Sequence, residues 1–306
     1  MTTMSQLTAS SQAALFIPTE TVGESKGFPE LDKTKTEVAL APMFTPNPHM
    51  PQMAMSVPTN IAQAIIKKES GEVIATCKGS HTLVQTDHLH RHMKKAFSAV
   101  LPQKWVDSMT LEEGVSANGA FNVCKYTSPD YSASIRQSSG KIIKLDMGMM
   151  TINHHGSRAV MVMPFMLDNS CQNNVIFTAE KASQHHTEGF AKHMVTKAPE
   201  HFKTIQAWAH TPFSKDQFAA ILRANSQISA QQSNAIVEYF EKVEAPVRGK
   251  NLYAALSALA AWGSHNTGDF YVRNSRNSDN EAESLFSRQE KIARLIASSA
   301  FQRVAS

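Results

Sequence analysis

The densest group of residues that could carry chemistry is the nine-residue stretch 87–95, Asp-His-Leu-His-Arg-His-Met-Lys-Lys. On a helix, His88 and His92 are four residues apart and share a face, a spacing that can bind zinc. No HExxH glutamate follows, and no spacing elsewhere in the chain supplies the remaining ligands. The alternatives are a surface without a ligand and a basic surface on which partly protonated imidazoles and three cations attract phosphate. These cations are Arg91, Lys94 and Lys95.

A thiol nucleophile is the second candidate. Cys171 would need a base such as His154 or His155, oriented by Asp168, within hydrogen-bond distance. Cys171 follows the two histidines by well over ten residues, which is some tens of ångström along an extended strand at about 3.3 Å per residue. A cysteine in an apolar strand is more often part of the core. We therefore predict no catalytic residue and keep a metal- or thiol-dependent enzyme centred on these side chains as the alternative.

Aromatic and basic residues alternate in two further places. Residues 270–277 read Phe-Tyr-Val-Arg-Asn-Ser-Arg-Asn, and residues 125–144 carry two tyrosines among four cations. Stacking of bases on aromatic rings, with cations on the phosphates, is how proteins bind single strands without sequence preference. Ordinary strand and loop residues are the alternative interpretation. The predicted nucleic-acid-binding residues are Arg91, Lys94, Lys95, Arg136, Lys141, Lys144, Tyr271, Arg273 and Arg276.

Other classes of chemistry lack their signatures. The chain has no GxxxxGK[ST] loop, no GxGxxG fingerprint and no GxSxG elbow, so we predict no cofactor, no metal and no nucleotide hydrolysis. A net charge of +4 and a pI of about 8.9 permit nucleic-acid binding without indicating it. Three widely spaced cysteines, no secretory signal and no apolar run of membrane-spanning length favour a cytoplasmic protein without a membrane partner.

The elements that would position these residues form successive blocks. Residues 1–58 are rich in Ser, Thr, Pro and Met and predict an irregular or partly disordered arm. Residues 59–178 predict a β-rich module with one helix. This helix is expected from about His88 to Leu101, with Asp87 as its N-cap. Residues 179–306 predict a helical region packed on the sheet. Because the strands have short connections, we predict an α+β fold, with an antiparallel sheet module and a following helical region.

The individual elements follow from hydrophobic spacing, capping signatures and prolines. Ser214 with Gln217 is a capping signature, and Pro199 is expected to separate two helices. The predicted strands cover 73–78, 82–85, 120–126 and 131–136, and the predicted helices cover 179–196, 200–210, 215–224, 230–243, 252–262 and 281–300.

The most strongly patterned stretch runs from Gly140 to Phe177. Two apolar, β-favouring runs flank the polar sequence Asn-His-His-Gly-Ser at 153–157, and the second run ends in Asp-Asn-Ser-Cys-Gln-Asn at 168–173. Glycine tolerates the positive φ that a tight reversal needs, so this stretch predicts a β-hairpin. We predict that Asn153 and Gly156 shape its turn. Asn169, Gln172 and Asn173 are predicted to satisfy buried backbone groups where the sheet meets the helices.

These motifs resemble those of a family of phage-, plasmid- and prophage-borne proteins catalogued as domain of unknown function 932. Its members carry an Asn-Ser-His-Asp-Gly-Ser/Thr-like turn, a strand, and then Arg-x-x-Cys-Gln-Asn. This chain lacks the Asp of that turn and has Asp168 in place of the Arg, so no catalytic or phosphate-binding role carries over to these positions. The matching residues are Asn153, His155, Gly156, Ser157, Cys171, Gln172 and Asn173.

The resemblance implies a mobile-element context and no established activity. Combined with the cations and the missing nucleotide site, it leads us to expect a protein that binds or anneals single-stranded DNA in replication, recombination or repair. A sheet followed by helices is also the general layout of phage annealing proteins, which commonly form rings, so a homo-oligomer is expected. The alternatives are the enzyme described above and a host-directed interaction protein.

Overall fold

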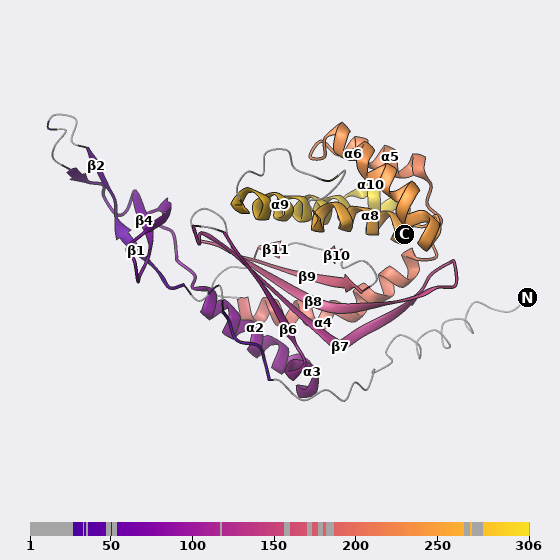
Figure 1. The fold of residues 1–306 in the computed structure, drawn as a ribbon, viewed down its shortest axis with the longest axis horizontal. Coiled ribbons are helices and arrows are strands. Elements are labelled where there is room, and N and C mark those ends of the chain that lie inside the picture. Colours follow the sequence, from indigo (N-terminus) through magenta and orange to yellow (C-terminus); the bar gives the residue numbers. More distant parts are fainter. Residues whose placement is uncertain are drawn as a thin grey trace, which may run out of the picture.

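The fold is seen in a computed structural model that describes residues 27–32, 34, 36–46, 50, 54–116, 118–155, 160–169, 173–176, 180–181, 187–265, 270 and 278–305. A central antiparallel sheet lies between two groups of helices, and a smaller β-structure projects from one end (Figure 1). The predicted α+β class, an antiparallel sheet followed by helices, is confirmed.

The central sheet is built on long antiparallel neighbours. Its strands, in the order in which they pair, are β10 (Asn173–Ile176), β9 (Met161–Asp168), β8 (Ile142–His154), β7 (Phe121–Arg136) and β6 (Thr110–Val115), and β11 (Glu180–Lys181) also pairs with β9. The predicted hairpin is confirmed, because β8 and β9 pair from Leu145↔Asp168 to Ile152↔Met161. β8 is paired on both sides and is buried along most of its length, as expected of a central strand.

The two strands predicted at 120–126 and 131–136 are one strand, β7. The register against β8 shifts between Ser128 and Ser132, which marks a β-bulge that absorbs the extra residues. The Ser128 hydroxyl accepts a hydrogen bond from the Tyr131 N–H (3.2 Å) and donates one to the Trp105 carbonyl (3.2 Å). The bulge therefore keeps its polar groups satisfied and lets the chain continue where a break was predicted.

Gly148 lies on β8 directly under the buried ring of Phe165 on β9. A Cβ atom at this position would lie 2.3–2.7 Å from three atoms of that ring. We expect Gly148→Ala to lower the free energy of unfolding by about 1–3 kcal/mol, the usual cost of overpacking. Urea denaturation followed by circular dichroism measures the effect. Gly114→Ala is the matched control, because its Cβ would meet only the Val123 Cβ, at 3.8 Å; equal midpoints for the two variants would contradict the prediction.

The projecting β-structure comprises residues 38–78, which we call the wing. Its elements are β1 (Val38–Pro42), β2 (Phe44–Pro46), β3 (Ala54–Ser56), β4 (Ala62–Lys67) and β5 (Val73–Lys78). The sheet order is β1-β4-β5, and β2 pairs with β3. Short strands thus lie inside the segment predicted to be irregular, and the β1–β4 pairing continues across the boundary predicted at residue 58.

The predicted strand 82–85 is wrong, because these residues have no regular structure, whereas the strand predicted at 73–78 is confirmed as β5. The side chain of Gln85, the residue before α2, binds strand β1 of the wing through two hydrogen bonds. Its side-chain oxygen accepts from the Val38 N–H (3.2 Å), and its amide nitrogen donates to the Val38 carbonyl (2.7 Å).

Helix α2 (Thr86–Val100) begins one residue before Asp87, so the prediction that Asp87 is the N-cap is wrong. The cap is Gln85, whose side chain makes no capping hydrogen bond. The Asp87 carboxylate instead lies 2.9 Å from the Arg91 guanidinium, one turn along the helix. After Pro102, the short helix α3 (Gln103–Asp107) leads into β6.

Helix α4 (Thr187–Trp208) replaces the two helices predicted on either side of Pro199. A proline inside a helix removes one hydrogen bond and crowds the preceding turn, which is why a break was expected. The helix continues because its inner face is held by packing: Phe202 and Ile205 are fully buried, and α4 packs along α2 and β9. Tertiary contacts outweigh the local cost here.

The remaining helices form the second group in Figure 1. They are α5 (Lys215–Ala224), α6 (Ala230–Tyr239), the π-helix η1 (Phe240–Glu244), α7 (Ala245–Arg248), α8 (Leu252–Ser264), α9 (Ser278–Ile296) and α10 (Ser299–Ala305). The predicted α5 and its capping box of Ser214 and Gln217 are confirmed. The helix predicted at 281–300 is two helices, α9 and α10. Helix α8 is buried over residues 252–263 and forms the centre of this group.

Candidate nucleic-acid interface

The exposed face of α2 carries Arg91, Lys94 and Lys95, while the opposite face is buried. Arg91 pairs with Asp87, but both side chains are more than half exposed, so the pair contributes little to stability. The Lys94 ammonium lies 5.7 Å from the centre of the Phe28 ring, a cation–π contact that leaves the cation at the surface. The α2 cations are therefore placed where a phosphate backbone could reach them.

Aromatic residues form the layer beneath this helix. The Phe28 ring stacks on Tyr126, with centroids 5.8 Å apart, and packs against His90 at 5.2 Å. His90 Nδ1 lies 2.9 Å from the Tyr126 hydroxyl, and burial lowers the pKa of His90. His90 is thus a neutral core residue, unlike the more exposed His88 and His92. Its spacing of four from buried Thr86 and three from buried Met93 is the signal that separates it from them.

Glu113 fastens the segment that carries Phe28. Its carboxylate accepts from the backbone N–H of Asp32 (2.8 Å) and of Thr34 (3.1 Å), and also from the Thr34 hydroxyl. Part of the segment predicted to be an irregular arm therefore packs against α2 and the sheet.

A second basic group lies on the hairpin that joins β7 to β8. The side chains of Arg136 and Lys141 are exposed. Lys144 instead makes contacts within the chain. Its ammonium donates to the Pro129 carbonyl (2.9 Å) and lies 3.4 Å from Asp146. Burial raises the pKa of the Asp146 carboxyl, even though Asn169 donates a hydrogen bond to it (2.8 Å). Arg136 and Lys141 are thus the cations of this hairpin that remain available to a ligand.

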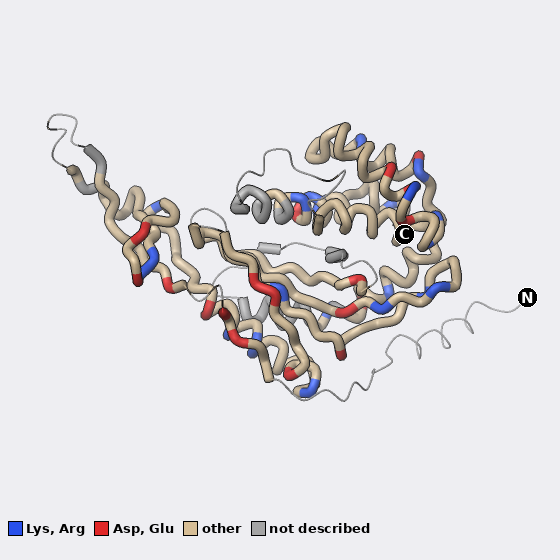
Figure 2. The backbone as a smooth tube through the Cα atoms, in the orientation of Figure 1, with Lys and Arg blue, Asp and Glu red and all other residues tan. Residues whose placement is uncertain are grey.

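The two basic groups do not share one groove. Helix α2 and the β7–β8 hairpin lie toward opposite ends of the sheet, and Figure 2 shows their cations as separate blue segments. Helix α4 links them: it packs along α2, and its Gln206 side chain hydrogen-bonds the N–H (3.2 Å) and carbonyl (3.0 Å) of Arg136. Lys203 is exposed on the same helix. The remaining predicted residues, Tyr271, Arg273 and Arg276, lie outside the described residues.

The turn after β8 is held by buried amides and an imidazole. His155 is 2% exposed, and its Nε2 lies 2.9 Å from the Asn122 side-chain nitrogen, so the ring accepts a hydrogen bond in its neutral form. Burial, followed by the neighbouring His154, lowers the pKa of His155 to about 4. Asn153 donates to the Val84 carbonyl (2.9 Å) and to the Thr86 hydroxyl (3.2 Å). These contacts tie the turn to the start of α2.

The rest of the predicted motif is only partly described. Gly156, Ser157, Cys171 and Gln172 lie outside the described residues, and Asn173 is placed in β10 by its backbone alone. Within the described part of the chain, no three His, Cys, Asp or Glu side chains are grouped as metal ligands would be. The enzyme centred on this turn stays the alternative to the predicted absence of a catalytic residue.

A buried ion network joins the end of β9 to the helices, and sequence reasoning missed it. Asp168 is 0% exposed and Arg248 is 3% exposed. The Arg248 Nη2 lies 2.8 Å from the Asp168 carboxylate, and its Nε donates to Glu244. The Tyr253 hydroxyl donates to the same Asp168 oxygen (2.8 Å). The available signal was an acidic residue closing an apolar strand, which requires a buried partner.

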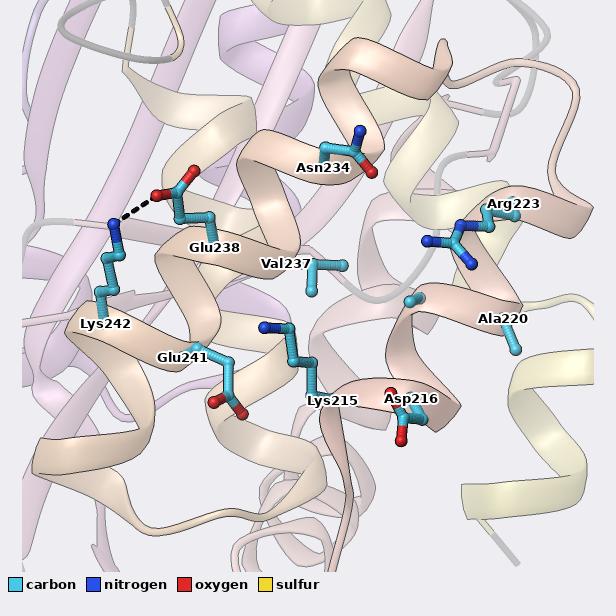
Figure 3. A pocket seen from close by; sticks show the side chains of 10 residues that line it. Lys215, Asp216, Ala220, Arg223, Asn234, Val237, Glu238, Glu241 and Lys242 are labelled. Carbon is cyan, nitrogen blue, oxygen red and sulfur yellow. Dashed lines mark hydrogen bonds and ion pairs between the residues drawn. The ribbon is translucent and has the colours of Figure 1, made fainter.

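A cavity of about 440 Å³ lies between α5 and α6 (Figure 3). Three cations and three carboxylates line it, and Lys242 pairs with Glu238. Lys250 lies 3.5 Å from Glu241. Because the lining charges balance, the cavity does not favour an anionic ligand. Its charged side chains are Lys215, Asp216, Arg223, Glu238, Glu241 and Lys242.

Comparison with known proteins finds no match among family models, curated proteins or solved structures. Among the helices that the structure describes, none is both long enough and apolar enough to cross a bilayer.

Proposed function

We propose that this chain is a cytoplasmic mobile-element protein that binds or anneals single-stranded DNA in replication, recombination or repair, without hydrolysing nucleotides. The observation that carries the proposal is the exposed face of α2, where Arg91, Lys94 and Lys95 lie within about one helical turn. Cations on such a face displace the counterions condensed on nucleic acid, which drives binding that is independent of sequence. The resemblance of the β8–β9 motifs to a phage and plasmid family supports the mobile-element setting.

The arrangement suggests a path for the strand. A single strand bound across α2 and along α4 would pass Lys203 and end near Arg136 and Lys141 on the hairpin. Each phosphate contact contributes about 0.7 to the slope of log affinity against log salt for single strands. A path that uses both basic groups predicts a steeper slope than α2 alone.

The experiment measures fluorescence anisotropy of labelled single-stranded DNA, duplex DNA and single-stranded RNA over a range of salt. Arg91→Ala/Lys95→Ala is expected to weaken single-strand binding roughly tenfold and to reduce the salt slope by about 1.4, because two phosphate contacts are lost. Alanine is a good helix former, so α2 should remain intact.

The matched control is Lys242→Ala/Arg294→Ala, which removes two exposed helical cations away from α2. It is expected to bind as the unaltered protein does. An absence of binding at low salt, or an equal loss in both double variants, would refute the proposal. Annealing is followed separately, by energy transfer between complementary labelled strands.

A further inference from the structure

A π-helix forms part of the wall of the cavity between α5 and α6. The two helices are joined by the short connection 225–229 and pack against each other, which makes them antiparallel neighbours. The π-helix η1 directly continues α6 and contributes Glu241 and Lys242 to the cavity lining. A π-helix is rare and occurs frequently at functional sites. At about 440 Å³, the cavity also falls within the size range of small-ligand sites.

The antiparallel arrangement gives the cavity two chemically different ends. Arg223 lies in the last turn of α5, and Figure 3 shows it toward the same end of the cavity as Asn234 of α6. Lys215 and Asp216 begin α5 and therefore lie toward the other end, where η1 contributes Glu241. Asp216 and Arg223 are seven residues apart, which corresponds to about 10 Å along the helix.

The charges of the lining are unevenly distributed between these ends. Lys242 donates a hydrogen bond to Glu238, which lowers the pKa of that carboxyl, and the charge of Lys215 lowers it further. Lys215, Asp216 and Arg223 have no ion-pair partner among the residues that the structure describes. Arg223 thus gives its end a positive charge, whereas at the other end the lining carboxylates outnumber the lining lysines by one.

Glu241 has a carboxylate oxygen that lacks a hydrogen bond. Its Oε1 is shielded from water, yet it accepts no hydrogen bond in the described part of the chain. The Lys250 ammonium lies 3.5 Å from this oxygen, but the Lys250 side chain is 67% exposed and outside the cavity lining, so solvent screens much of its charge. A buried acceptor without a donor requires an explanation. An ammonium group bound in the cavity would supply that donor.

We propose that this cavity binds a short peptide of two or three residues with free termini. The terminal carboxylate pairs with Arg223, whose planar guanidinium can donate two parallel hydrogen bonds to it. The terminal ammonium binds Asp216 and Glu241. Three extended residues span about 10 Å, which matches the separation of the two ends. A ligand with one charge of each sign fits a lining whose total charge is balanced, and buried Val237 offers apolar contact to a small side chain.

Isothermal titration calorimetry with matched peptides tests the proposal. The probes are dialanine, trialanine, trialanine acetylated at its N-terminus and trialanine amidated at its C-terminus. Trialanine is expected to bind about tenfold more tightly than either blocked form, because each block removes one charge-assisted contact. If neither dialanine nor trialanine binds at concentrations up to about 10 mM, the proposal is overturned. Equal binding of trialanine and its two blocked forms would also overturn it.

Variants connect each peptide terminus with its side chains. Arg223→Gln is expected to bind trialanine and its amide equally, while it still prefers a free ammonium. Asp216→Asn/Glu241→Gln is expected to bind trialanine and its acetylated form equally, while it still prefers a free carboxylate. Circular dichroism checks that both variants are folded.

The control Arg294→Gln removes an exposed helical cation outside the cavity and should keep both preferences. Arg91→Ala/Lys95→Ala should keep them as well, because peptide binding does not depend on the basic face of α2. Preferences that persist unchanged in Arg223→Gln and in Asp216→Asn/Glu241→Gln would place the peptide elsewhere and overturn the proposal.

Discussion

Replacing Arg248 by methionine is expected to lower the free energy of unfolding by about 3–5 kcal/mol, the usual cost of breaking a buried ion pair. Arg248 supplies the cation for two buried carboxylates, Asp168 and Glu244. Methionine fills a similar volume but leaves both carboxylates without their positive partner. The penalty is therefore mainly that of uncompensated buried charge and not that of a cavity.

Two further variants distinguish the loss of the buried cation from the loss of a single hydrogen bond and from the loss of an exposed ion pair. Tyr253→Phe removes a single hydroxyl donor to Asp168 and is expected to cost about 1–2 kcal/mol. Arg294→Met is the matched control, because Arg294 also pairs with a glutamate four residues earlier but is 56% exposed. It should cost less than about 1 kcal/mol. Urea denaturation followed by circular dichroism measures all three, and similar losses for Arg248→Met and Arg294→Met would contradict the prediction.

The buried network around Arg248 gives Asp168 a structural role. The sequence marked Asp168 in two ways, as a departure from the arginine of the motif it resembles and as a group that could orient a histidine beside Cys171. In the structure, Asp168 closes β9 and receives Arg248 from α7 and Tyr253 from α8. Charge at this position therefore serves to join the sheet to the helices. The arrangement needs the carboxylate and the guanidinium together, so Asp168→Arg is expected to be as damaging as the loss of Arg248.

Local sequence signals predicted the local parts of the fold. The start of α5 follows from the Ser214–Gln217 capping box, and the β8–β9 pairing follows from two apolar, β-favouring runs on either side of a Gly- and Asn-containing turn. Both depend on residues close together in the chain. Pro199 misled the prediction of α4 because the packing that sustains the helix comes from α2 and the sheet.

The candidate site likewise has features that local sequence signals predict and features that depend on contacts between distant residues. The α2 cations lie on the side opposite the buried Met93 and Phe97, and helical spacing accounts for this placement. The pairing of Asp168 with Arg248 could not be predicted, because no periodic pattern relates residues so far apart. The relative position of α2 and the β7–β8 hairpin depends on the whole sheet, and the exposed wing becomes visible only when its packing is known.

Acid is expected to destabilise this protein through His155 before its carboxylates are protonated. Its pKa is lowered from 6.5 to about 4 in the folded state, because the buried ring is accessible to little water and lies beside His154. The unfolded chain therefore binds a proton at a higher pH than the folded chain does. Stability is full above about pH 6.5 and falls as the pH drops toward 4, by up to about 3 kcal/mol from this group.

His155→Gln isolates this contribution. Glutamine keeps a side-chain oxygen that can accept from Asn122 but carries no titrating proton. We expect a loss of about 1–2 kcal/mol at pH 7.5, where packing is changed, and a shallower fall between pH 6.5 and 4. His88→Gln, on the exposed part of α2, should keep the steep fall of the unaltered protein. Urea midpoints at a series of pH values measure the slopes, and parallel slopes for the unaltered protein and His155→Gln would refute the prediction.

Protonation of His155 is also expected to loosen the residues that lead into the basic helix α2. Asn153 and His155 hold the turn against Val84 and Thr86, the residues that lead into α2. Protonated His155 cannot accept a hydrogen bond from Asn122, so the turn should open first when the pH falls. Amide hydrogen exchange would then accelerate around Val84 and Thr86 at a pH where the centre of β8 remains protected. Uniform acceleration along the chain would instead indicate that His155 acts only through global unfolding.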